Sequence, residues 1–112
     1  LPMAHKTYTK RLGILRRKEG MPYEAFKTHW LDVHAQLCLK LPNMRRYAVN
    51  FVDRERFPHF PYDGFSELYF DSEEALIASL GSPEGKTLLA DLPNFTSEIF
   101  PIVAVEHTLL GE

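Results

Sequence analysis

The stretch GFSELYFDSEEALIASLGS, residues 64–82, carries the pattern on which the fold prediction depends. Its first part, GFSELYF (64–70), is rich in aromatic and other β-forming side chains, so it is predicted to be a strand. Asp71 and Ser72 follow as a helix cap, two glutamates lie in the first turn, and Gly81 closes the segment. This arrangement favours a helix that begins directly after the strand.

The segments on either side of this unit predict the remaining elements. Alternating and β-forming side chains predict strands at 7–17, 44–53 and 100–110. A helix is expected to begin at Pro22, because proline suits the first turn of a helix. It is expected to end before Pro42, because the residue before a proline disfavours the helical conformation.

The helix that begins at Pro22 carries one apolar stripe. Its members recur at helical spacing and are expected to pack on the sheet: Phe26, Trp30, Val33 and Leu37. A last helical segment is predicted to start at the Ser82–Pro83 pair and to be broken at Pro93.

The resulting order is βαββαβ with a split second helix. This order is typical of an α+β, ferredoxin-like fold with a four-stranded antiparallel sheet and helices on one face. A single domain is expected over residues 6–110, after a flexible N-terminus at 1–5. The other sheet face would still expose apolar side chains, so two copies are expected to stack these faces as a homodimer.

Composition and charge exclude several kinds of partner. The 112-residue chain has a formal charge of −2, which gives no electrostatic case for nucleic-acid binding. It has one cysteine, so it cannot form an internal disulfide, and no apolar run approaches the roughly 20 residues that span a bilayer. We therefore expect a cytoplasmic protein without a membrane partner. It contains no glycine-rich dinucleotide loop, Walker loop, nucleophile elbow or C-x-x-C motif, so no cofactor is expected.

Two histidines in the stretch THWLDVHAQLCLKLP (28–42) raise the question of a metal site. His29 and His34 are five residues apart, and at about 100° per residue they diverge by about 140° around an α-helix. The two imidazoles are therefore not expected to converge, and no metal is expected. His29 is expected to form a semi-exposed contact with Asp32. Cys38 is expected to be a small buried hydrophobe rather than the partner of His34 in a dyad.

His34 and Glu67 are the two candidates for proton transfer. His34 lies at the edge of the apolar stripe, where partial desolvation would hold its pKa in a useful range. The alternative is a packed histidine with one ring nitrogen bonded to a backbone carbonyl. Glu67 lies in the centre of an apolar strand, and a partner that covered it would raise its pKa. Its alternative is a structural glutamate bonded to Tyr47 or Arg46.

Other candidates lie on the strands and on the loop that follows residue 53. His59 lies between two prolines, which limit the entropy lost when a loop side chain is positioned. Four strand residues could point into the same cavity: Tyr47, Tyr69, Asn50 and His107.

Several segments together resemble the EthD family of the dimeric α/β-barrel superfamily. They are the strand that ends in RRKEGM, the EAF…HW…H helix, the LPNMRRY entry to the second strand and the block YDGFSELYFDSEEAL. The resemblance runs from about Lys6 to Leu110 and implies the same ferredoxin-like fold. It also implies that His34, His59 and Glu67 lie around one cleft. In the 4-methylmuconolactone methylisomerases of this group, to which the chain is similar, a cysteine stands in the place of Glu67.

The residues and the resemblance together predict a cofactor-free acid/base enzyme. Its substrate would be a small organic acid, a lactone or an aromatic-derived compound, and its reaction an isomerase or lyase step in a catabolic pathway. The catalytic groups would be Glu67, His34 and His59. The substrate would contact Tyr47, Tyr69, Trp30, Asn50 and His107. The alternatives are a non-enzymatic ligand-binding or accessory protein of an oxidative degradation system, a cofactor-free monooxygenase and a polyketide-cyclase-like enzyme.

Overall fold

The computed structural model of the protein describes residues 6–111, so the expectation of a flexible N-terminus lies outside the described residues. In chain order the elements are β1 (Lys6–Arg17), α1 (Tyr23–Thr28), the π-helical segment η1 (His29–His34), α2 (Ala35–Cys38), β2 (Arg46–Phe51), β3 (Gly64–Phe70), α3 (Glu73–Leu80), α4 (Pro83–Asp91), the 3₁₀ turn η2 (Leu92–Asn94) and β4 (Thr96–Thr108). The predicted βαββαβ order is confirmed.

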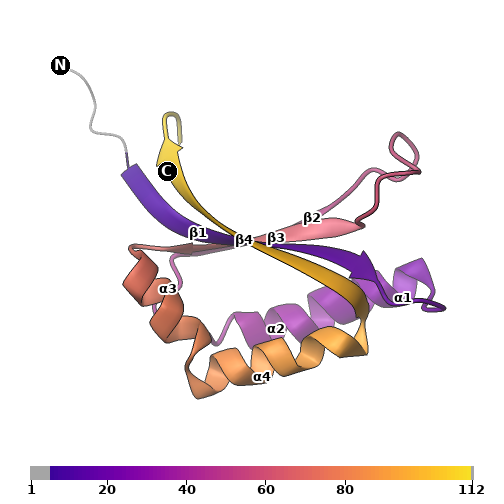
Figure 1. The fold of residues 1–112 in the computed structure, drawn as a ribbon, viewed down its shortest axis with the longest axis horizontal. Coiled ribbons are helices and arrows are strands. Elements are labelled where there is room, and N and C mark those ends of the chain that lie inside the picture. The colour runs from indigo at the N-terminus through magenta and orange to yellow at the C-terminus, as the bar shows by residue number, and fades with distance from the viewer. Residues whose placement is uncertain (1–5, 112) are drawn as a thin grey trace.

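The strands form one antiparallel sheet in the order β2-β3-β1-β4, and the helices lie together on one of its faces (Figure 1). The predicted α+β, ferredoxin-like fold is therefore confirmed. β3 has its predicted bounds. β4 begins at Thr96 instead of residue 100, because the backbone after η2 pairs at once with Arg17 at the end of β1.

Both later helices begin at a serine, as their sequence suggested. The Ser72 hydroxyl accepts a hydrogen bond of 3.1 Å from the backbone N–H of Ala75. The Ser82 hydroxyl accepts one of the same length from the backbone N–H of Gly85. These bonds satisfy N–H groups that have no partner inside the helix, so each helix starts at a defined residue.

The core fills the space between the sheet and the helices in two clusters. One consists of Leu15, Phe26, Trp30 and Phe95. The other consists of Cys38, Leu41, Leu68, Phe70, Leu76 and Leu88.

The side chains that the first helix turns toward the sheet are not all those that its sequence predicted. Phe26 and Trp30 are buried as expected, but Val33 is 44% exposed, and His34 is buried instead. The cause is η1, where the N–H of Ala35 bonds to the carbonyl of Trp30, five residues earlier. Each π-helical bond encloses one residue more than an α-helical bond, so the later residues are rotated relative to the sheet. The prediction that Val33 packs on the sheet is wrong.

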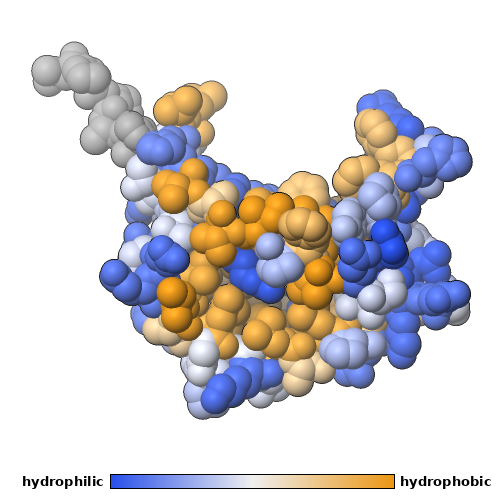
Figure 2. All heavy atoms as spheres, viewed as in Figure 1, coloured by the Kyte–Doolittle hydropathy of each residue, from blue (hydrophilic) through white to orange (hydrophobic). Residues whose placement is uncertain are grey.

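No helix of residues 6–111 covers the second sheet face, which we call the open face. The strand register places Leu12, Ile14, Phe65 and Ile102 on it, between polar residues. The loop that follows β2 and the C-terminal end of β4 both project on this side (Figure 1). Figure 2 shows the hollow between these two projections. Among the described residues, no helix is both long and apolar enough to cross a bilayer.

Candidate functional site

Two imidazoles converge on one carboxylate beneath the sheet. His34 Nδ1 lies 2.9 Å from Asp91 Oδ2, and His29 Nε2 lies 3.0 Å from both oxygens of the same carboxylate. The histidines come from η1 and the aspartate from the last turn of α4. The expectation that His29 and His34 diverge is wrong, because it assumed α-helical geometry. In a π-helical segment the bonds run from residue i to residue i+5, which brings these two side chains to the same side.

Asp91 is buried and accepts hydrogen bonds from three side chains. Asn94 Nδ2 donates to its Oδ1 at 2.9 Å, and the two histidines occupy further acceptor sites. Burial alone would raise the pKa of Asp91, but the bonds from Asn94, His34 and His29 hold that pKa below its usual value. The group is therefore an ionised carboxylate, which can only accept hydrogen bonds.

The state of Asp91 determines the tautomer of His34. Burial lowers the pKa of His34, and the neighbouring Asp91 only partly opposes this effect. His34 is therefore a neutral imidazole at neutral pH. Since its Nδ1 faces an acceptor, Nδ1 carries the proton and Nε2 carries a free lone pair. No hydrogen bond of Nε2 is formed within the described part of the chain.

His34 lines a narrow pocket between the sheet and α4. The pocket has a volume of about 10 Å³, which is barely enough for one water molecule. The lining residues are Arg11, Gly13, Leu15, His34, Cys38, Tyr47, Ser66, Leu68, Leu88, Leu89, Leu92 and Ile99. Figure 2 shows apolar side chains gathered over this side of the molecule, around a small hydrophilic area.

The thiol of Cys38 also lines the pocket but is not a nucleophile there. The residue is 1% exposed, and burial raises the pKa of its thiol to about 12. A thiol must be ionised to attack or to bind a metal strongly. Cys38 therefore packs as a small hydrophobe, as the sequence predicted.

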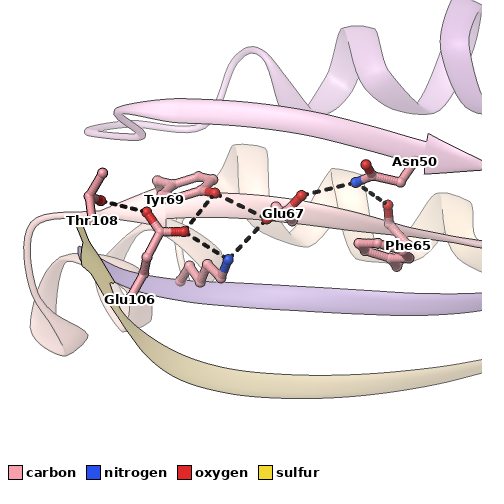
Figure 3. Close-up of polar contacts among 7 residues, drawn as sticks. Asn50, Phe65, Glu67, Tyr69, Glu106 and Thr108 are labelled. Carbon is pink, nitrogen blue, oxygen red and sulfur yellow. Dashed lines mark hydrogen bonds and ion pairs between the residues drawn. The ribbon is translucent and has the colours of Figure 1, made fainter. Parts of the chain in front are cut away.

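A second polar cluster lies on the open face, around Glu67 (Figure 3). Lys10 Nζ bridges Glu67 Oε2 at 2.9 Å and Glu106 Oε1 at 3.0 Å. The Tyr69 hydroxyl donates to the same two carboxylates, and Asn50 Nδ2 donates to Glu67 Oε1 at 3.0 Å. The three predicted residues Glu67, Tyr69 and Asn50 therefore do meet, together with Lys10 and Glu106, which the sequence analysis missed.

The charge of Glu67 is stabilised rather than suppressed. Burial would raise the pKa of Glu67, but the bonds from Lys10, Asn50 and Tyr69 lower that pKa overall. In the single chain the pKa of Glu67 is therefore lowered, and the rise expected when a partner covers this face stays a prediction. An ionised glutamate paired with a lysine is a weak acid catalyst.

The predicted triad does not assemble within one chain. Side chains alternate along β3, so Glu67 faces the open side while its neighbours Ser66 and Leu68 face the helices and the His34 pocket. His59 is exposed on the loop after β2. The expectation that His34, His59 and Glu67 surround one cleft is wrong, because the sheet separates His34 from Glu67.

The remaining residues that were predicted to contact the substrate lie in three separate parts of the molecule. Tyr47 lines the His34 pocket. Trp30 is 0% exposed, packed against Phe26 and Phe51, so its predicted contact with substrate is wrong. His107 is exposed near the end of β4 and lines a shallow groove that also includes Tyr69.

Two further residues were not predicted: Asp91, the partner of His34, and Arg11, in the wall of the pocket. Asp91 is the last residue of α4, and nothing near it in sequence marks a histidine partner. Arg11 stands in the strand segment KRLGILRR, where it looks like one of several surface charges. Strand alternation was the available signal, because it puts Arg11 on the same face as Leu15.

The residues that the structure describes offer no group of three or more His, Cys, Asp or Glu side chains suited to a metal ion. In the cluster of His29, His34 and Asp91, the ring nitrogens bond to the carboxylate itself. The geometry is that of a hydrogen-bonded dyad with a second histidine, and it can orient an imidazole for proton transfer.

The fold defines the class of protein first: an α+β, ferredoxin-like protein with one four-stranded sheet. An EthD family protein of Bacillus halodurans has the same fold, with a TM-score of 0.74 and 22% identity over 91% of this chain and 99% of that one. A dimeric ferredoxin-like protein of unknown function from Thermobifida fusca has a TM-score of 0.68 and 13% sequence identity, over 92% of each chain. A hydroxynitrile lyase from Passiflora edulis has a TM-score of 0.72 and 10% sequence identity, over 95% of this chain and 98% of that one.

The family follows from the sequence match. Residues 18–99 match the EthD domain, so the chain belongs to the EthD family. This confirms the predicted resemblance to the EthD family, while the similarity to the 4-methylmuconolactone methylisomerases stays a prediction. Comparison with curated proteins gives no match.

Proposed function

We propose that this protein is a cofactor-free enzyme that moves a proton on a small organic acid, lactone or aromatic-derived compound, in an isomerase or lyase reaction. The observation that carries the proposal is the pair of Asp91 and a neutral, buried His34 in the wall of a pocket. His34 acts as the base through Nε2, and Asp91 is a positioning residue that holds the proton on Nδ1.

The proposed chemistry needs only groups of this chain. A neutral imidazole accepts a proton from a carbon next to a carbonyl, and the imidazolium formed is stabilised by the Asp91 carboxylate 2.9 Å from Nδ1. The same nitrogen returns the proton at another carbon in an isomerisation, or to a leaving group in an elimination. General acid–base catalysis of this kind contributes about 10²–10⁴-fold to a rate. The hydroxynitrile lyase from Passiflora edulis provides an example of a lyase with this fold.

Substrate entry requires side chains to move, because the closed pocket holds no more than about one water. Among the aliphatic residues of its lining, Leu89, Leu92 and Ile99 are the accessible ones. Leu89 is 37% exposed, and leucine side chains can change rotamer without breaking a hydrogen bond. We therefore place the entrance between the end of α4 and the edge of β4.

The protein is also proposed to be a homodimer through the open face. Beside the Glu67 cluster, that face carries an apolar depression of about 460 Å³. It is lined by Leu12, Ile14, Val52, Phe57, Phe60, Gly64 and Phe65. An apolar surface of this extent is unfavourable in water, and a second copy would cover it. The related fold of the Thermobifida fusca protein is described as dimeric.

Proton exchange tests the proposed activity directly. Small lactones and organic acids are incubated with the protein in D₂O, and loss of the hydrogen next to the carbonyl is followed by NMR. We expect His34→Ala to slow this exchange by about 10²–10⁴-fold. Asp91→Asn should also slow it, because an amide can donate to Nδ1 and leave the proton on Nε2. Asp71→Asn is the matched control, since Asp71 is an exposed carboxylate paired with Arg45.

The other outcomes separate the rival functions. Full exchange in the His34→Ala variant would contradict the proposal. A compound that binds but undergoes no exchange or other change favours a ligand-binding or accessory protein. Oxygen uptake with an aromatic compound favours a cofactor-free monooxygenase, and ring closure of a polyketide favours a cyclase.

A further inference from the structure

Arg11 occupies an unusual place for a charged residue. It lies near the middle of β1, with Leu68 and Val103 directly opposite on the two neighbouring strands. All three side chains are on the face that the helices cover. The guanidinium reaches the pocket that is lined by His34 and Tyr47.

Arg11 has no counter-ion within residues 6–111. Some basic groups do have one: Lys10 pairs with Glu67 and Glu106, Arg16 with Glu98, Arg45 with Asp71, Arg54 with Asp63, and Arg56 with Asp53. Arg11 differs from the other basic residues without an ion pair in that it lines the His34 pocket. The carboxylate bonded to His34, that of Asp91, is already occupied by His29, His34 and Asn94. Burial lowers the pKa of Arg11, and its charge contributes to the low pKa of His34. Arg11 is half-buried, and a partly desolvated charge without a partner costs free energy, so a carboxylate ligand would stabilise it.

The backbone beside Arg11 keeps a second hydrogen-bond donor close to the guanidinium, in the same pocket that opens to a ligand only when side chains of its wall move. Gly13 is the next residue of β1 on the same face. A Cβ atom at Gly13 would lie 2.9 Å from Ser66 Oγ and 3.5 Å from Arg11 Nη1. Because glycine has no Cβ, the hydroxyl and the guanidinium both come close to the bare backbone of Gly13, with no side chain of that residue between them. Both groups donate hydrogen bonds, and no hydrogen bond of the Ser66 hydroxyl is formed among the residues that the structure describes.

We propose that Arg11 and Ser66 form a subsite that binds the carboxylate of a small organic acid next to His34. The guanidinium presents two parallel N–H groups to the two carboxylate oxygens, a geometry that carboxylates match closely. The Ser66 hydroxyl donates a further bond. This inference rests on the proposed function, because it names the substrate class of the same pocket, and it predicts that acids are preferred to their neutral analogues.

The test compares propionate with propionamide, which has nearly the same shape and no charge. Binding is followed by NMR titration of the His34 imidazole in the wild-type protein. We expect propionate to bind at least about tenfold more tightly, since a charge-assisted bond contributes more than a neutral one. Equal affinities, or the absence of saturable propionate binding, would overturn the subsite. This comparison needs no variant and does not depend on the folding of one.

Variants then assign the preference to Arg11. In Arg11→Gln the affinity for propionate should fall about tenfold or more, while that for propionamide stays unchanged. Arg11→Lys should restore part of the loss, because lysine keeps the charge but not the two-pronged geometry. Arg45→Gln, which removes an exposed arginine elsewhere, is the matched control. Wild-type affinity for propionate in Arg11→Gln would contradict the assignment.

The subsite and the proposed function can fail separately. If propionate binds through Arg11 but no compound exchanges its hydrogen, the subsite stands and the enzymatic proposal falls. If lactones undergo His34-dependent exchange while propionate and propionamide bind alike, the enzymatic proposal stands and the subsite falls.

Discussion

At the scale of single residues, His34 is held neutral against an ionised partner. Its imidazole is 7% exposed, and the protein supplies one acceptor, Asp91, at 2.9 Å. Burial lowers the pKa of His34 more strongly than Asp91 raises it. The result is a base that stays unprotonated through neutral pH and keeps a fixed tautomer.

This lowered pKa has a consequence for stability that can be measured. Below about pH 6.5, the ordinary pKa of histidine, the unfolded chain binds a proton at His34 that the folded chain does not bind. The free energy of unfolding should therefore fall as the pH drops from 6.5 to the lowered folded pKa, by at most about 1.4 kcal/mol per pH unit for one proton. Above pH 6.5 the protonation of His34 has no effect on the free energy of unfolding. Urea unfolding at several pH values, for the wild type and His34→Gln, measures the difference in slope.

Asp91 acts in the same direction but in a separate, more acid pH window, so it does not interfere with this experiment. The folded pKa of Asp91 is lowered below its usual 3.8, so its contribution is present above that value and is lost only at more acid pH. Equal slopes for the wild type and His34→Gln between about pH 7 and about pH 5 would mean that folding does not lower the pKa of His34, and would contradict this prediction.

At the scale of elements, η1 decides which side chains of the first helix reach the sheet. The stripe that begins with Phe26 and Trp30 would continue at Val33 in an α-helix. In the structure it continues at His34 and Cys38, and Val33 turns to solvent. One π-helical segment thus places a titratable group where an aliphatic one was expected, as π-bulges often do at functional sites.

Two alanine substitutions test this change of phase. Trp30→Ala should lower the free energy of unfolding by about 3–5 kcal/mol, because it leaves a cavity in the core. Val33→Ala should cost no more than about 1 kcal/mol, because Val33 is 44% exposed. Chemical denaturation of both variants gives the two values. A loss at Val33 comparable to that at Trp30 would show that the helix is α-helical throughout and packs through Val33.

At the scale of the whole molecule, the two sheet faces have different roles. The covered face holds the core and the His34 pocket. The open face holds an apolar depression and the cluster of Glu67, Lys10 and Glu106. Glu67 is thereby removed from the proposed base and placed at the proposed interface between two copies.

The dimer prediction is tested by sedimentation. The wild type should sediment at about twice the chain mass of 13.0 kDa. Ile102→Lys puts a charge on the open face and should shift the protein toward the monomer. Ile77→Lys is the matched control, because Ile77 is 60% exposed on α3, away from that face. A wild-type mass near 13.0 kDa would contradict the dimer.

Local sequence determined most of the architecture of this protein. The strand Gly64–Phe70, the serine caps of the later helices and the order of the elements all follow from interactions between near neighbours. These features depend on backbone propensity and local hydrogen bonds, which a short stretch of sequence contains. Alternation along the strands was also available but was not applied to Tyr47 and Asn50, which were expected in one cavity and lie on opposite faces.

Only the tertiary structure decided which polar groups meet. His29 and His34 converge because of a π-helical segment that the sequence does not signal, and Asp91 joins them from a helix 57 residues away from His34. Lys10 on β1 lowers the pKa of Glu67 on β3, and these two residues are also 57 positions apart in sequence. The sheet, in turn, separates Glu67 from His34. Such pairings depend on packing between distant segments, and the free energy of a buried charge is determined by those neighbours rather than by the residue itself.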